Sequence, residues 1–123
     1  MKKLLIICLL LFTSQAFADW TLSSKEHGVQ YYFDSAKINK QGRYVDFWFL
    51  INLPRKNNYG DISATQKIKI DCKLSRMKTL SNFSYAKSMG RGKPRTANQV
   101  ADKQWSKIPS NSHMMTGLEK VCR

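Results

Sequence analysis

Acidic residues are scarce in this chain. Its 123 residues include 8 Asp and Glu against 21 Lys and Arg, which gives a formal net charge of +13. The few carboxylates are scattered along the sequence, a pattern that does not favour a paired-carboxylate active site or a metal site. The sequence also lacks a CxxC pair, a Cys/His cluster and a Gly-x-Ser-x-Gly motif, so we expect no metal ion, no cofactor and no catalytic residues. The basic excess predicts attraction to acidic surfaces without specifying which.

The N-terminal apolar segment is too short to cross a membrane. As a helix Leu4–Phe12 would be about 14 Å long, against a hydrocarbon layer of about 30 Å. Lys2 and Lys3 precede it and Ala16-Phe17-Ala18 follows, which is the pattern of a secretory signal. A retained anchor is one alternative, and lipid attachment at Cys8 is another that its large neighbours disfavour.

We therefore predict a signal over residues 1–18 that is cleaved before Asp19, and a single domain over residues 19–123 without a transmembrane segment. The protein is expected in the periplasm, on the outer surface or in the medium. Two cysteines remain after cleavage, Cys72 and Cys122. An even pair in an oxidising compartment predicts a disulfide, which helps a domain of this size because it buries only about two thirds of its surface.

The strongest structural signal is a strand over Arg43–Leu53. Alternate residues Val45, Phe47, Phe49, Ile51 and Leu53 form one apolar face, whereas the other face is mixed: Tyr44, Asp46, Trp48, Leu50 and Asn52. β-branched and aromatic residues dominate the segment. It predicts a central strand of an antiparallel sheet whose apolar face is covered by a later part of the chain.

A second strand is predicted by the alternation from Thr65 to Leu74. Here Ile68, Ile70, Cys72 and Leu74 are expected to face inward and Lys67, Lys69, Asp71 and Lys73 to face water. We expect strands at Asp19–Leu22 and Val29–Asp34, with a turn over Ser23–Gly28 between them. Ser75–Met89 fits no single register and predicts a bulge or turn before another strand, Thr96–Gln104 has no clear periodicity, and Trp105–Ile108 is a possible last strand.

The cover for the sheet is predicted at the C-terminus. Ser110 or Ser112 can cap a helix after Pro109, and a stripe formed by Met114, Leu118, Val121 and Cys122 is apolar. Cys122 lies on this stripe and Cys72 on the apolar strand face. The predicted fold class is therefore α+β: an antiparallel β-sheet with a C-terminal α-helix packed on one face and tethered by a disulfide.

The sequence resembles the surface-adhesin protein E family of bacterial envelope proteins. The resemblance spans the predicted domain and is carried by these residues: Trp20, Tyr32-Phe33-Asp34, Ile38, Val45, Trp48, Ile70-Asp71-Cys72-Lys73, Met89-Gly90, Gly92, Trp105, Ile108-Pro109 and Val121-Cys122. It implies the same sheet-and-helix fold. It also implies a non-enzymatic binding protein, an adhesin for host matrix proteins.

The basic residues are the main functional signal. We expect a basic face that binds an acidic protein or a polyanionic glycan or lipid surface, and its candidate residues are Lys67, Lys69, Lys73, Arg76, Lys78, Arg91, Lys93 and Arg95. Trp48 and Tyr85 are candidate aromatic contacts for a partner or for a second copy of the chain. Alternatively, the lysines only keep the sheet soluble and protect its edges.

Two other functions remain open. One is a periplasmic partner-binding or inhibitor protein without host contact. The other is a small basic secreted nuclease in which His27 and His113 form an acid/base pair, although a turn and a helix start favour solvated surface histidines instead. Nothing in the sequence indicates a site for a specific nucleic acid.

Overall fold

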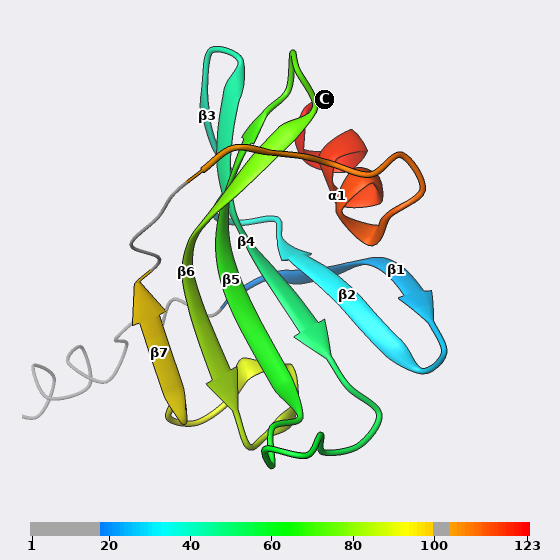
Figure 1. The fold of residues 1–123 in the computed structure, drawn as a ribbon, viewed down its shortest axis with the longest axis vertical. Helices are drawn as coiled ribbons and strands as arrows, with labels where there is room; N and C mark the ends of the chain where they lie inside the picture. Colours follow the sequence, from blue (N-terminus) through cyan, green and yellow to red (C-terminus); the bar gives the residue numbers. More distant parts are fainter. Residues whose placement is uncertain (1–17, 100–103) are drawn as a thin grey trace, which may run out of the picture.

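The computed structural model describes residues 18–99 and 104–123 and contains an antiparallel sheet with one helix on one face (Figure 1). The strands pair in the order β1-β2-β4-β5-β6-β7, β3 pairs with β4, and β8 pairs with β6. Their bounds are β1 Trp20–Glu26, β2 Val29–Asp34, β3 Asn39–Gln41, β4 Tyr44–Asn52, β5 Ser63–Asp71, β6 Arg76–Tyr85, β7 Thr96–Gln99 and β8 Ser106–Lys107. The predicted α+β class is confirmed.

The long strand β4 lies in the middle of the sheet, as its apolar face predicted. It pairs with β2 on one side and along its whole length with β5 on the other. The hydrophobic core is built on the face that carries Phe47 and Phe49, and its buried members are Phe33, Val45, Phe47, Phe49, Ile68, Ile70, Ile108, Leu118 and Val121. Burial of such side chains contributes about 1.5–3 kcal/mol each, so this layer dominates the stability of the domain.

Helix α1 (His113–Val121) covers that face (Figure 1). Ser112 is the N-cap, since its Oγ accepts a hydrogen bond of 3.1 Å from the N–H of Met115. Leu118 and Val121 are buried on the predicted stripe. The disulfide joins Cys72 to Cys122 across 50 positions, with a Cα–Cα distance of 5.8 Å. The predicted C-terminal helix and the disulfide that ties it to the sheet are therefore both confirmed.

The predicted irregularity between Ser75 and Met89 is a bulge in β6. Lys67 pairs with Ser81 but the next residue, Ile68, pairs with Thr79, so the pairing skips Leu80. Beyond β6 a single 3₁₀ turn, Ser88–Gly90, precedes β7. Ser106–Lys107 forms the expected last strand.

Three local predictions are wrong. β1 continues to Glu26, with a register shift between Leu22 and Ser24, so the turn to β2 is only at His27 and Gly28. β5 ends at Asp71, and Leu74 is 53% exposed in the turn that follows. Asp71 is fully buried instead of facing water, because arginines outside the strand bind it.

The segment that lacked periodicity also contains a strand, β7. Threonine and the cross-strand partners in β6 favour it although no alternation marks it. The predicted signal over residues 1–18 lies, apart from Ala18, outside the described residues, so cleavage before Asp19 stays a prediction. Within the described ranges, no helix is long and apolar enough to cross a membrane.

Candidate binding surface

The face of the sheet opposite α1 carries the other set of alternating side chains, and we call it the outer face. The strand register brings them together: Trp48 pairs with Lys67, Leu50 pairs with Thr65, and Thr65 pairs with Phe83. Since paired residues point to the same side of a sheet, aromatic and basic side chains of three strands lie next to one another. The outer face is therefore where the candidate aromatic contact Trp48 and part of the basic set meet.

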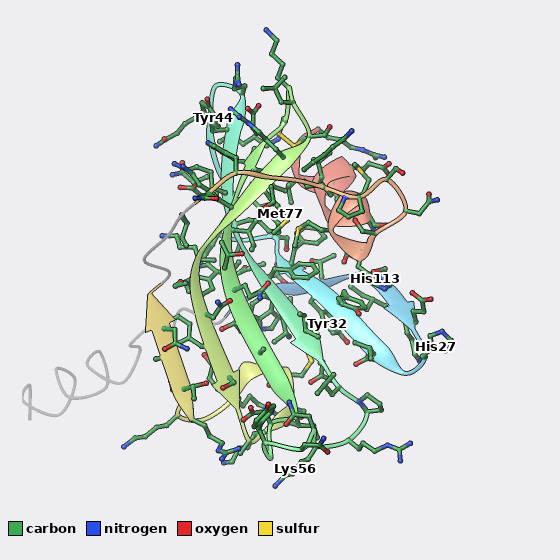
Figure 2. The ribbon with its side chains drawn as sticks, in the orientation of Figure 1. His27, Tyr32, Tyr44, Lys56, Met77 and His113 are labelled. Atoms are coloured by element: carbon green, nitrogen blue, oxygen red, sulfur yellow. A yellow bond between two sulfur atoms is a disulfide. The ribbon has the colours of Figure 1, made fainter. Side chains whose placement is uncertain are left out.

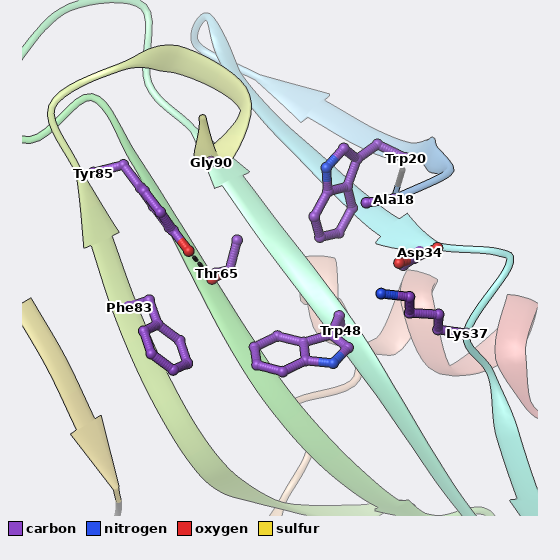
Figure 3. Close-up of a pocket in the computed structure, with 9 residues that line it drawn as sticks. All are labelled: Ala18, Trp20, Asp34, Lys37, Trp48, Thr65, Phe83, Tyr85 and Gly90. Carbon is purple, nitrogen blue, oxygen red and sulfur yellow. Dashed lines mark hydrogen bonds between the residues drawn. The ribbon is translucent and has the colours of Figure 1, made fainter. Parts of the chain in front are cut away.

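A cleft of about 310 Å³ lies on the outer face, and we call it the aromatic cleft (Figure 3). Its lining residues are Ala18, Trp20, Asp34, Lys37, Trp48, Thr65, Phe83, Tyr85 and Gly90. The rings of Trp48 and Phe83 are 5.8 Å apart and tilted by 41°. Its volume falls at the lower end of small-ligand sites, and aromatic walls with a few polar groups are typical of such sites.

One wall of the aromatic cleft is the 3₁₀ turn after β6. Gly90 there has a φ of +62°, and a Cβ at this position would lie 3.1 Å from Cγ2 of Thr65 and 3.5 Å from Cδ1 of Leu50. The turn is fastened to the sheet because the N–H of Gly90 donates to Oγ of Ser63 (2.9 Å) and the N–H of Met89 to Oδ1 of Asn52 (2.8 Å). This close cover explains why Leu50 is fully buried on a face that was expected to be mixed.

A second, more polar cavity of about 200 Å³ adjoins the first. It is lined by Lys37, Asn39, Asp46, Phe47, Trp48 and Lys67. Lys37 and Trp48 line both cavities, so the two cavities are neighbours, and we call them together the groove. The polar part holds charges of both signs, since Nζ of Lys69 lies 3.8 Å from Oδ1 of Asp46.

The predicted basic residues occupy three separate places. Four lie on β5 and β6 at the outer face: Lys67, Lys69, Arg76 and Lys78. Lys69 pairs directly with Lys78, and Lys67 lies across from Trp48. Lys67 lines the groove and Lys69 lies beside Asp46, which also lines it, so these two lysines are the part of the predicted basic face that lies at the groove.

The other four lie at the ends of the sheet. Lys73 is exposed in the β5–β6 turn, whereas Arg91, Lys93 and Arg95 are exposed in the loop between the 3₁₀ turn and β7. Arg91 donates to Ser88 (Nε to the carbonyl at 3.1 Å), and Arg95 forms an ion pair of 3.0 Å with Asp61. The basic segment is thus not one surface.

Arg76 belongs to a charge cluster around the buried carboxylate of Asp71. Oδ2 of Asp71 accepts from Nη2 of Arg43 (2.6 Å) and from Nε of Arg76 (3.0 Å). Burial by itself would raise the pKa of Asp71, but hydrogen bonds from Arg43, from the N–H of Leu74 and from Arg76 outweigh it and lower the pKa to about 2. Arg76 is therefore tied to a structural role.

Trp105 stacks on the same cluster. Its ring centroid is 5.8 Å from that of Tyr44, 4.6 Å from the guanidinium carbon of Arg76 and 4.4 Å from Nζ of Lys78. Such cation–π contacts are worth about 0.5–1 kcal/mol each at exposed sites. Trp105 thereby fastens the chain before β8 to the outer face, near the upper end of the sheet where Figure 2 labels Tyr44.

The two candidate aromatic contacts both line the aromatic cleft. Trp48 and Tyr85 are half-buried, and Oη of Tyr85 lies 3.4 Å from Oγ1 of Thr65. Each therefore has a packed side and a side toward the cleft. The sequence did not single out Trp20, Asp34 or Lys37 as site residues. They come from β1, β2 and the following connection, and their tertiary position has no local sequence signature.

The two histidines meet at one carboxylate, which sequence reasoning did not anticipate. Nε2 of His113 lies 2.9 Å from Glu26 and Nε2 of His27 lies 3.5 Å from it (Figure 2 labels both histidines). Nδ1 of His113 is 2.9 Å from Oγ of Ser24, and its ring stacks on Tyr31 at 3.8 Å. His113 is therefore not a solvated surface histidine. Both its nitrogens and one ring face are engaged in joining α1 to the β1–β2 hairpin.

A metal centre is not seen in residues 18–99 and 104–123, where no group of three or more His, Cys, Asp or Glu side chains could hold an ion. The groove on the described surface is lined by aromatic side chains, by two carboxylates and by two lysines: Trp20, Trp48, Phe83, Tyr85, Asp34, Asp46, Lys37 and Lys67.

Comparison with solved structures gives the fold a precedent. The chain is similar to protein E from Haemophilus influenzae, with 15% sequence identity and a TM-score of 0.62 over 89% of this chain and 87% of that one. It is also similar to protein E from non-typeable Haemophilus influenzae, with 17% identity and a TM-score of 0.67 over 89% and 78% of the two chains. At these identities the likeness concerns the fold.

No curated protein matches the chain. The family model described as surface-adhesin protein E matches residues 20–123, which is all but the N-terminal part. The matched range includes both disulfide cysteines, the helix and all the strands. The chain belongs to the surface-adhesin protein E family.

Proposed function

We propose that this protein is an exported, adhesin-like binding protein that captures a polyanionic glycan on the outer face of its sheet. Membership of the surface-adhesin protein E family supports a binding function at the cell envelope or beyond it. The observation that carries the proposal is the groove: Trp48 and Lys37 line both its aromatic cavity and its polar cavity, and Lys67 also lines the polar one.

The chemistry of the groove suits an acidic sugar. Trp48 and Phe83 offer apolar ring surface against which a sugar ring can pack, and Thr65 and Tyr85 offer hydroxyl groups. Lys37, Lys67, Lys69 and Lys78 supply positive charge beside it for sulfate or carboxylate groups. Asp34 and Asp46 offset part of this charge, so binding relies on the lysines that surround the groove rather than on the net charge of the whole protein.

The test compares two variants that lose the same charge at different places. The outer-face variant carries Lys67→Gln, Lys69→Gln and Lys78→Gln. The control variant carries Lys56→Gln, Lys73→Gln and Lys93→Gln, which are exposed in loops (Figure 2 labels Lys56). Binding of a heparin-derived oligosaccharide to the immobilised proteins is measured at several salt concentrations.

Exposed ionic contacts are worth about 0.2–1 kcal/mol each, so the outer-face variant should raise Kd about tenfold at low salt and flatten the salt dependence. The control variant should change Kd much less. Equal losses in both variants would mean that the oligosaccharide responds only to net charge, and unchanged binding in both would remove the basic face from the function. Trp48→Phe should keep the fold and part of the binding, while Trp48→Ala should lose more.

Localisation is tested separately. Fractionation of the source cells should find the protein in the periplasm, at the outer surface or in the medium. Recovery in the periplasm alone would favour an envelope partner over a host glycan.

A further inference from the structure

Asp34, at the end of β2, is a buried carboxylate that forms no ion pair with another side chain of the described residues. Its side chain is 1% exposed, and its Oδ1 accepts hydrogen bonds of 3.1 Å from the N–H groups of Asp19 and Ala36. Among residues 18–99 and 104–123, no Lys, Arg or His forms an ion pair with it. Burial of a charged group is unfavourable unless the charge is paired, so this position calls for a positive charge.

Hydrogen bonds to Ser35 hold Asp19, whose main-chain nitrogen would carry a positive charge if it were the N-terminus, next to Asp34. The carbonyl of Asp19 accepts from the N–H of Ser35 (3.0 Å) and from its Oγ (3.1 Å). Thr21 adds a hydrogen bond to the same Oγ (3.0 Å). The main-chain nitrogen of Asp19 therefore lies beside the Asp34 carboxylate, and hydrogen bonds to both the N–H and the carbonyl of Asp19 hold the residue in place.

We infer that cleavage between Ala18 and Asp19 completes this site by creating an ion pair between the new N-terminus and Asp34. This inference rests on the export that we propose. Hydrolysis consumes one water: Ala18 gains a carboxyl group and Asp19 gains an amine. The amine takes up a proton at neutral pH, because the ordinary pKa of an α-amino group is about 8. The weak amide donor thereby becomes an ammonium 3.1 Å from Oδ1 of Asp34.

The same cut changes the aromatic cleft. Ala18 and Asp34 both line it (Figure 3). Cleavage therefore removes Ala18 from the wall of the cleft and places a positive charge beside the Asp34 carboxylate. Lys37 also lines the cleft and forms no ion pair in the described part of the chain. Once Asp34 is paired with the new N-terminus, its negative charge no longer offsets the charge of Lys37. The mature cleft consequently presents a more positive potential to an anionic ligand than the uncut chain does.

The test is a double-mutant cycle on purified chains of defined start. One chain begins at Asp19; the other begins at Ala16, which keeps an amide at Asp19 and moves the ammonium away. Each is made with Asp34 and with Asp34→Asn, and urea unfolding gives the four unfolding equilibrium constants. We expect Asp34→Asn to increase that constant about tenfold more in the chain from Asp19 than in the longer chain.

Equal effects of Asp34→Asn in the two chains would overturn the inference. If the Asn variants do not fold, the two unsubstituted chains still test it: the shorter chain should have the higher urea midpoint, and its α-amine should react with an acylating reagent several-fold more slowly than that of the longer chain. Equal midpoints and equal labelling would also refute it. Because the cycle needs neither a ligand nor cellular cleavage, its failure is separate from a failure of the proposed function.

Discussion

Loss of the Cys72–Cys122 bond should cost this domain a large part of its stability. The bond closes a loop across 50 positions, which in the chain-entropy description is worth about 4 kcal/mol. Domains of this size are stable by only about 5–15 kcal/mol. With a urea dependence of about 2 kcal/mol per molar, the transition midpoint should fall by about 2 M when both cysteines are replaced by Ser.

The structure also says which part is released. α1 buries Leu118 and Val121 against the sheet, and without the bond it is held by such packing and by the engagement of His113 with the β1–β2 hairpin. A helix of this length is marginal in isolation. We therefore predict that the double Ser variant exposes Phe49 and its neighbours, which binding of a hydrophobic dye would detect.

The assay compares oxidised protein, reduced protein and the double Ser variant by urea unfolding. The reduced protein and the variant should agree, since both lack the bond without a change elsewhere in the core. A midpoint shift below about 0.5 M, or reaction of both cysteines with a thiol reagent in the folded oxidised protein, would refute the reasoning.

Three further predictions concern charge, the turn and processing. The pKa of Asp71 lies at about 2 instead of its ordinary 3.8, so the stabilisation from its ion pairs is present above pH 4 and is lost as the pH falls toward 2. Acid unfolding followed by circular dichroism should show this loss of stability in the parent protein and not in Asp71→Asn, and identical pH profiles of the two would contradict the prediction. Gly90→Ala should destabilise the domain more than Gly42→Ala, because both glycines have a φ of +62° but only at Gly90 would the Cβ meet Thr65 at 3.1 Å; equal melting temperatures would contradict this contact. Intact-mass measurement of protein from the source cells should give a chain that begins at Asp19, and a retained or lipid-bearing N-terminus would contradict the predicted cleavage.

The layers of the fold could be predicted from local patterns. The alternation of Val45, Phe47 and Phe49 and the stripe of Leu118 and Val121 are periodic, so each element defines its own buried face. The disulfide followed because only two cysteines remain after signal removal. Each of these features depends on the composition or spacing of one segment.

The features that escaped prediction depend on residues far apart in sequence. Alternation placed Asp71 in water, yet Arg43 and Arg76 make its burial possible. The aromatic cleft depends on a loop that folds back over Leu50 and on the β1–β2 hairpin that brings Asp34 to it. No window of sequence contains both partners of such contacts.

The central claim, that ligands bind on the outer face, can be tested by mapping amide and indole NMR shifts of the mature protein during titration with a heparin-derived oligosaccharide. We predict that the shifts concentrate at Trp20, Trp48, Lys67 and Lys69, with the Trp48 indole among the strongest, while α1 stays unchanged. Shifts confined to α1 or to the loops at the ends of the sheet, or no shifts at a saturating ligand concentration, would contradict the claim.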